Sequence, residues 1–246
     1  ADVIDSHIRA TLPPGVPLLT NYYGLGFNEQ AFRVAEGRRP DLVASHLSFR
    51  TGDTDRGRAY QRWYAARHPA MASLAVAATH LGRAPIGNIL EGRDTHGVYA
   101  EADPDKRIPP TIYGFDGMVH RLQPDRETTL DYDLTRMGER QGGIWQELYR
   151  QLERHGPMDH QTRSLLAWQH ALQAAHGLRR GWRQIATDEL QRGRKLAPQD
   201  GMLRRLQLRL DALDAAWQRG DSAAFRALWQ GYEHMTLDQL VDTRTP

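Results

Sequence analysis

A glycine-containing segment is the clearest candidate for ligand chemistry in the first half of the chain. Residues 24–29, with Gly24 and Gly26, follow a run of strand character and open an expected helix. In that position, glycine loops cradle phosphate groups with backbone N–H groups at a helix N-terminus. Glu29 stands where the dinucleotide fingerprint has its third Gly, and its charge opposes a diphosphate. The pattern therefore favours a tight turn, with Asn21, Gly24 and Gly26 kept as candidate ligand-binding residues.

A pair of carboxylates follows the second expected strand. Asp53 and Asp55 lie two residues apart in the segment 51–57. A hard cation such as calcium binds oxygen ligands of this kind, but the segment lacks the remaining ligands of a calcium loop. Capping of the helix expected over residues 56–66 accounts for the same side chains. Capping is the favoured interpretation, and Asp53 stays a candidate ligand-binding residue.

The eleven histidines do not form a metal-binding pattern. His155 and His160 flank a Gly-Pro pair, while His170 and His176 lie six residues apart and so on different faces of a helix. No pair has the i, i+4 spacing with Glu that a metalloprotease uses. A Walker loop, a nucleophile elbow and a Ser-x-x-Lys motif are also missing from the sequence. We therefore predict no metal, no cofactor and no catalytic residue.

Basic residues are concentrated in the second half. Residues 177–209 contain nine basic and three acidic side chains. On packed helices these side chains would form one basic surface for an acidic peptide, for anionic lipid head groups or for nucleic acid. The partner-binding candidates are Arg179, Arg180, Arg183 and Arg192. Solvated faces of amphipathic helices explain the same pattern, and nucleic acid is disfavoured because aromatic residues do not alternate with the basic ones.

The elements of the first half alternate between helix and strand. The spacing of Ile4, Ile8 and Leu12 predicts a helix that ends at Pro13. Strands are expected over residues 16–23 and 42–49 with a helix between them, which is the spacing of a right-handed crossover. Further helices are expected at 56–66 and 69–81, and further strands at 85–90, 97–101, 112–115 and 118–122. This half is predicted to be an α/β domain, residues 1–125, with a small mixed sheet and flanking helices.

The second half, residues 126–246, is predicted to be all helical. A short helical piece is expected at 130–137, and longer helices at 144–154, 161–177, 182–196, 202–219 and 222–234. A tetratricopeptide frame of 34 residues starting at Ala167 places small residues at Ala174 and Ala186, where two helices must approach closely, and Pro198 near the end. Gly193 stands where that repeat prefers Ala. The sequence thus predicts a tetratricopeptide-like helical hairpin region.

Composition further restricts the class of protein and its chemistry. The chain has 246 residues, no Cys and a formal net charge of only +2, and two of its 32 basic residues are Lys. The absence of Cys excludes disulfides and thiolate chemistry. The longest mildly apolar stretch, residues 70–81, is too short to cross a bilayer, so a soluble module is predicted. Because the first residue is Ala, we expect a chain that was processed or cut from something longer.

Several short motifs resemble a known family of bacterial polytopic membrane proteins, which is related to protein O-mannosyltransferases. The run from Glu36 to Val43 is similar to the family's strand–helix–"E-G-x-R-P-D-V" pattern, and residues 117–122 resemble its "G-L-V-Y-R-L" segment. Residues 16–21, 84–86 and 108–110 add shorter similarities. The likeness covers the soluble region after the last membrane span, roughly residues 1–125, and the family often ends in tetratricopeptide-like helices. Its sugar-transfer acids lie in the membrane-embedded part, so no catalytic residue carries over.

Together these observations predict a non-catalytic, extracytoplasmic (periplasmic) interaction or accessory module. It would be the soluble part of a membrane glycosyltransferase-like protein, tethered through a preceding region, with a protein or peptide partner. The alternative is an enzyme domain that binds a nucleotide-sugar or another small ligand through residues 24–29, at the strand ends where open α/β sheets bind ligands.

Overall fold

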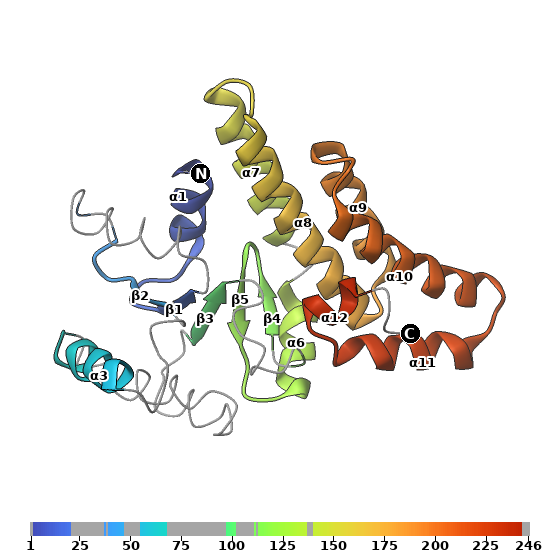
Figure 1. Cartoon of the computed structure of the whole chain (residues 1–246), viewed down its shortest axis with the longest axis horizontal. Helices are drawn as coiled ribbons and strands as arrows, with labels where there is room; N and C mark the ends of the chain where they lie inside the picture. Colours follow the sequence, from blue (N-terminus) through green and yellow to red (C-terminus); the bar gives the residue numbers. More distant parts are fainter. Residues whose placement is uncertain are drawn as a thin grey trace. The chain divides into compact units, whose positions relative to one another are not determined.

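The computed structural model describes residues 2–20, 37, 39–46, 55–67, 97–101, 111, 113–136 and 140–242 (Figure 1). The chain divides into two compact units. One comprises residues 2–149 without the segment 109–111 and contains the sheet. The other comprises Ala1, residues 109–111 and residues 150–246, and its described part is helical. Along the chain, the described elements therefore form a small mixed sheet with helices first and helices alone afterwards.

The sheet has five strands in the order β2-β1-β3-β5-β4 (Figure 1). Their bounds are Pro17–Thr20 for β1, Val43–His46 for β2, Val98–Glu101 for β3, Tyr113–Asp116 for β4 and Val119–Leu122 for β5. Strand β1, which lies between β2 and β3, runs parallel to both, with Leu18 opposite both Ala44 and Tyr99. The β4–β5 hairpin is antiparallel and joins through β5 to β3. The predicted mixed sheet is confirmed.

Burial explains the position of β1. Val16, Leu18 and Leu19 are buried without an alternating pattern, as expected for an interior parallel strand covered on both faces. The β4–β5 hairpin turns at Gly117, whose φ of 70° suits glycine. A Cβ at Gly117 would lie 2.9 Å from Cδ1 of Ile144, so this turn also packs closely against α7 (Arg140–Arg154).

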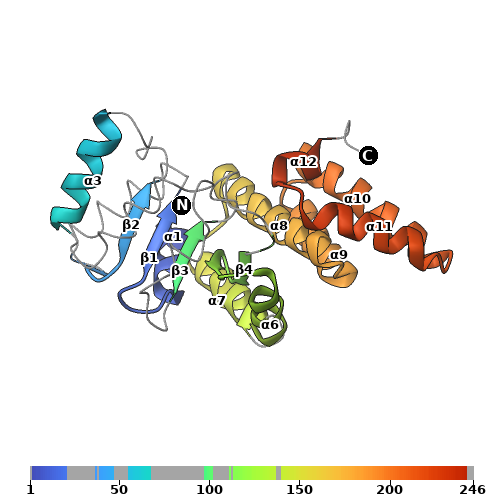
Figure 2. The same ribbon diagram turned by 90° about the horizontal axis from the view of Figure 1, so that it is seen from below.

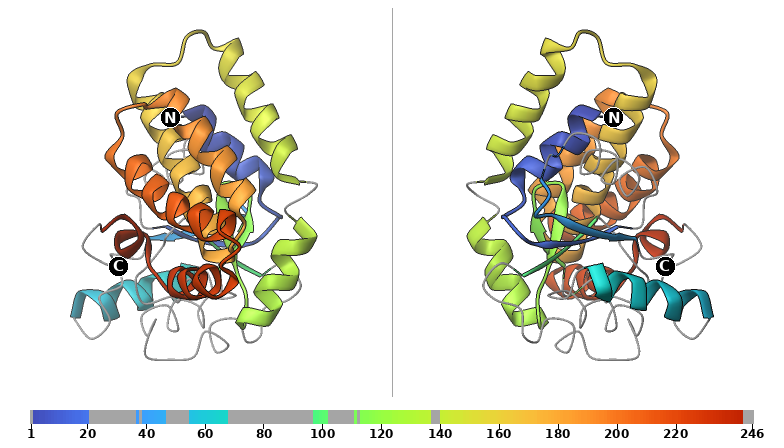
Figure 3. Two further views of the ribbon diagram at one scale, coloured as in Figure 1. Left: turned by 90° about the vertical axis from the view of Figure 1, so that its right-hand side faces the viewer. Right: turned by 90° about the vertical axis from the view of Figure 1, so that its left-hand side faces the viewer.

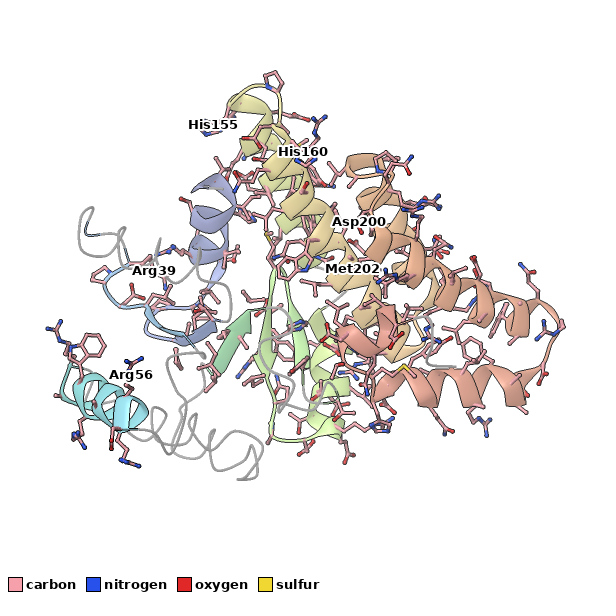
Figure 4. All side chains as sticks on the ribbon, in the orientation of Figure 1. Arg39, Arg56, His155, His160, Asp200 and Met202 are labelled. Carbon is pink, nitrogen blue, oxygen red and sulfur yellow. The ribbon has the colours of Figure 1, made fainter. Side chains whose placement is uncertain are left out.

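Helix α1 (Asp2–Thr11) buries Ile4 and Ile8 on one face and ends before Pro13, as predicted. Its C-terminal carbonyls are bound by the guanidinium of Arg39, which donates to the carbonyl oxygens of Arg9, Leu12 and Pro13 (Figure 4). Carbonyls at a helix C-terminus lack intrahelical donors, and a cation there also opposes the negative end of the helix dipole. Arg39 thus ties a segment near β2 to the end of α1.

Asp41 holds Arg39 in place. Its carboxylate accepts from Nη2 of Arg39 at 2.9 Å and from the backbone N–H of Gly15 at 2.9 Å. The hydrogen bond from Arg39, followed by the bond from Gly15, lowers the pKa of Asp41 to about 2. Arg39 and Asp41 therefore have a structural role in this chain: together they close the end of α1.

Helix α3 (Asp55–Arg67) follows β2, with exposed Arg56 near its start (Figure 4). Helix α6 (Arg126–Arg136) begins earlier than the piece expected from residue 130, because Asp125 accepts from the N–H of Thr128 at 2.7 Å and caps it. The expected helices at 29–36 and 69–81 and the expected strand at 85–90 lie outside the described residues.

Helix α6 belongs to the sheet unit. Tyr132 donates its hydroxyl to Asp116 at 2.8 Å, and a Cβ on Gly114 would lie 2.7 Å from the Tyr132 ring. Since α6 packs on β4 in this way, the sheet unit extends through Tyr149. The expected domain limit at residues 125/126 instead coincides with the start of α6.

The helical unit contains α8 (His160–Arg180), α9 (Arg183–Leu196), α10 (Gly201–Gln218), α11 (Ser222–Glu233) and α12 (Leu237–Val241). Figure 2 shows α8 beside α9 and α10 beside α11. The N-termini of α8, α10, α11 and α12 are capped by side-chain oxygens. The capping residues are Asp159, Asp200, Asp221 and Thr236. Sequence periodicity located the four long helices to within about four residues and did not reveal α12.

Helices α8 and α9 approach closely at one pair of small residues. A Cβ on Gly177 would lie 3.0 Å from the backbone N of Ala186 and 3.3 Å from its Cα. Ala186 therefore lies at a close approach of the two helices, with Gly177 as its partner there. Gly193 is also needed, because a Cβ there would lie 2.8 Å from Cδ2 of Leu203.

Helix α11 returns to the C-terminal end of α8 (Figure 3). Gly181, with φ 69°, ends α8 in the left-handed conformation, and its Cα faces the ring of Trp229. Trp229 donates its Nε1–H to the carbonyl of Arg179 at 3.0 Å. The four long helices of this unit thus close on one another around Leu166, Leu190 and the apolar residues of α10, which are Leu203, Leu206, Leu210 and Leu213.

Candidate interaction surface

The residues expected to bind a small ligand cannot be placed. Asn21, Gly24, Gly26 and Asp53 all lie outside the described residues, as does Glu29. Their roles stay predictions.

The four arginines expected to bind a partner do not share one open surface. Arg179 and Arg180 are buried, at 2% and 4% exposed. Arg179 donates its Nε–H to the carbonyl of Met235 at 2.9 Å, on the segment between α11 and α12. Sequence periodicity placed these two side chains on a solvated helix end, but the return of α11 covers that end. The expectation that they contact a partner is corrected accordingly.

The other two arginines are bound to acids of the helical unit. Arg192 donates to Glu189 at 2.7 Å, one turn earlier on α9. Arg183 pairs with Asp214 of α10, and its guanidinium lies 5.0 Å from the centroid of the Trp217 ring. An arginine over an aromatic face is attracted by the ring quadrupole. Arg183 therefore remains at the surface, next to an aromatic residue that the sequence did not single out.

A buried histidine pair lies between α8 and α9. Nδ1 of His170 is 2.6 Å from Oε2 of Glu189, and the two side chains are 0% and 5% exposed. Arg192 binds the other oxygen of Glu189, so this carboxylate has a partner on each side. The pair is enclosed between α8 and α9 and so contributes to the packing of the two helices. His155 and His160 are exposed on the two sides of the turn before α8 (Figure 4).

An aromatic hollow opens at the turn between α10 and α11. It has a volume of about 230 Å³ and is lined by residues from the end of one helix and the start of the next, namely Trp217, Gly220, Asp221, Ser222 and Phe225. The rings of Trp217 and Phe225 meet edge to face, with centroids 5.7 Å apart and planes at 64°. Trp217 is 60% exposed although it is among the largest apolar side chains of the chain. We refer to this feature as the Trp217 hollow.

The local sequence explains why the hollow stays open. The apolar stripe of α11 contains Phe225, Trp229 and Tyr232 at i, i+4 and i+7. Tyr232 is buried and Trp229 lies on the end of α8, so the C-terminal half of the stripe is covered. Phe225 lies in the first turn of α11, four residues before Trp229. Among the aromatic rings of the described residues, it contacts only Trp217. Aromatic residues on both sides of the Gly220 turn were the signal that sequence reasoning missed.

The described residues contain no group of three or more His, Cys, Asp or Glu side chains arranged to hold a metal ion. None of the described helices has the length and apolar character needed to span a bilayer.

Comparisons with models of protein families, with curated proteins and with solved structures give no match for this chain. The function of this chain is therefore inferred from its own site.

Proposed function

We propose that this chain is a non-catalytic interaction or accessory module whose helical unit supplies the partner surface. The observation that carries the proposal is the Trp217 hollow. Large exposed aromatic residues beside a concave surface mark protein contacts, and Trp is the residue type most enriched where interfaces gain their energy. The extracytoplasmic setting and the link to a membrane glycosyltransferase-like protein are supported by the resemblance of residues 1–125.

The size of the hollow favours a protein partner over a metabolite. Pockets for drug-sized ligands occupy roughly 300–1,000 Å³. The Trp217 hollow, at about 230 Å³ and lined on one side by a 60% exposed ring, suits a single large side chain. A single anchoring side chain in a pocket is how many protein interfaces obtain much of their affinity.

The tetratricopeptide-like character of the helical unit belongs to this proposal. Its support is the α8–α9 hairpin, with Ala186 at the close approach to Gly177. In a repeat array each unit contacts only its neighbours. The return of α11 to α8 closes this unit on itself, and the outer end of the α10–α11 hairpin, with the Trp217 hollow, is left for a partner.

A second candidate function has one supporting observation in the sheet. The chain leaves β1 for β2 on one side and then passes to β3 on the other, so the carboxyl ends of β1 and β3 form a topological switch point. Open α/β sheets bind ligands at such points. Thr20, at the end of β1, is fully buried, and its hydroxyl has no hydrogen-bond partner among the described residues. Residues 24–29 follow it, which supports a nucleotide-sugar site as the alternative.

Site-specific photo-crosslinking in the source cell tests the leading proposal. A photoreactive amino acid at Trp217 should give one defined protein adduct, whereas the same group at exposed Leu134 on α6 should not. A thermal shift of several degrees with a nucleotide-sugar, abolished by Gly26→Glu, together with no adduct at position 217, would favour the second candidate.

A further inference from the structure

The charges around the Trp217 hollow indicate what kind of partner it takes. Arg219 directly precedes the lining residue Gly220. Arg226 lies four residues after the lining residue Ser222 and therefore on the same side of α11. Both arginines are exposed, and neither forms an ion pair with another described residue. Two exposed arginines thus neighbour the lining residues of the hollow, one along the chain and one on the next turn of α11.

The acids near the hollow are already engaged. Asp214 is paired with Arg183, and Asp221 accepts the backbone N–H of Ala224 at 2.9 Å as the N-cap of α11. The carboxylate of Asp221 also faces the positive end of the α11 dipole. With Asp214 paired, Arg219 and Arg226 outnumber the one remaining carboxylate, that of Asp221, so the net charge beside the hollow is positive.

We infer that the Trp217 hollow binds an acidic peptide segment of a partner protein, with one large apolar side chain in the hollow and flanking carboxylates on Arg219 and Arg226. This inference rests on the proposed function and specifies its partner. Arginine forks bind carboxylates in a bidentate manner, which fixes the register of a peptide, while the buried side chain supplies affinity.

A second copy of the chain fits this surface less well. In a two-fold symmetric contact the same patch meets itself, so the arginines of one hollow would face those of the other. Like charges placed opposite each other across an interface oppose association. An acidic segment has the complementary charge.

Binding of short labelled peptides, measured by fluorescence anisotropy, tests the inference. The main probe has a central Trp flanked on both sides by Glu; one comparison peptide replaces Trp by Ala, and another replaces Glu by Lys. We expect each comparison peptide to bind at least about tenfold more weakly, since anchor residues and charge complementarity each contribute this much.

Variants then locate the site on the protein. Trp217→Ser, at an exposed position that leaves the core intact, and the double variant Arg219→Glu with Arg226→Glu should each weaken the main probe about tenfold or more. Arg205→Glu is the matched control, because this exposed arginine lies near the start of α10, about 18 Å along the helix from Trp217. The control should leave binding unchanged.

The possible results separate the inference from the proposed function. Equal weakening by Arg205→Glu, or no weakening by Trp217→Ser, would overturn the inference. No peptide binding together with a crosslinked protein at position 217 would refute the acidic-peptide chemistry and keep the interaction function. A dimer that Trp217→Ser disperses would make a second copy the occupant and refute the inference. Absence of both peptide binding and adduct would refute both.

Discussion

The close approach of α8 and α9 can be tested by adding one methyl group at Gly177. The added Cβ would lie 3.0 Å from the backbone N of Ala186, a distance that real Cβ contacts seldom show. Backbone atoms cannot move aside as a side chain can, so the helices must separate. Overpacking of this kind costs about 1–3 kcal/mol. Against that cost, Ala is favoured over Gly in a helix interior by about 1 kcal/mol.

Gly231 on α11 provides the matched control. It is exposed, it is helical, and a Cβ there would meet no atom within 4 Å. Gly231→Ala should therefore raise the free energy of unfolding by about 1 kcal/mol, the propensity gain alone. The free energy of unfolding of Gly177→Ala should be lower than that of Gly231→Ala by about 1–3 kcal/mol, because the overpacking cost arises only at Gly177.

Urea unfolding followed by far-ultraviolet circular dichroism measures both variants under the same conditions. Equal unfolding slopes would confirm that the comparison concerns the folded state. If Gly177→Ala and Gly231→Ala stabilise the protein to the same extent, within about 0.5 kcal/mol, then α8 and α9 do not meet at Gly177 and the packing of the helical unit must be different.

Three further predictions concern polar contacts. Because Arg39 lowers the pKa of Asp41 to about 2, this contact stabilises the fold fully above the unfolded-state value of about 4 and is lost as pH falls from there through 2; Asp41→Asn should cost about 1 kcal/mol at neutral pH, after screening of a partly exposed pair, and clearly less at pH 2, where the carboxyl is half protonated, as urea unfolding at both pH values would show. Glu189→Gln should lower stability by about 1–3 kcal/mol because buried His170 and half-exposed Arg192 lose the carboxylate between them, whereas Asp188→Asn, at a partly exposed position of α9, should stay within about 0.5 kcal/mol in the same assay. Tyr132→Phe removes a hydrogen bond to a carboxylate of β4 and should cost about 1–2 kcal/mol; a loss confined to the helical unit in hydrogen exchange would contradict this assignment.

Local patterns in the sequence were sufficient for most elements. The spacing of Ile4 and Ile8 located α1, and the Gly117 turn between two runs of β-forming residues located the β4–β5 hairpin. The parallel pairing of β1 with β2 followed from the length of the intervening segment. These features depend on neighbours in the chain, so periodicity and turn residues are enough to reveal them.

Features that depend on contacts between distant parts of the chain could not be predicted from such local patterns. Arg179 and Arg180 have the composition of a solvated helix end, and only the return of α11 buries Arg179 against Met235. Likewise, Trp217 has the spacing of an ordinary helix residue. Its exposure follows from where α11 leaves α10, which is a tertiary property.

The contact between α11 and the end of α8 has a consequence for biosynthesis. Trp229 and Met235 complete the last turn of α8 from 50 and 56 residues further along the chain. While the ribosome is still adding α9 and α10, the carbonyl and the guanidinium of Arg179 lack these two partners. A nascent polypeptide that stalls before Met235, or a fragment cut at Gly220, therefore leaves this contact surface of α8 uncovered, and the helical unit closes only after Met235 has left the ribosome.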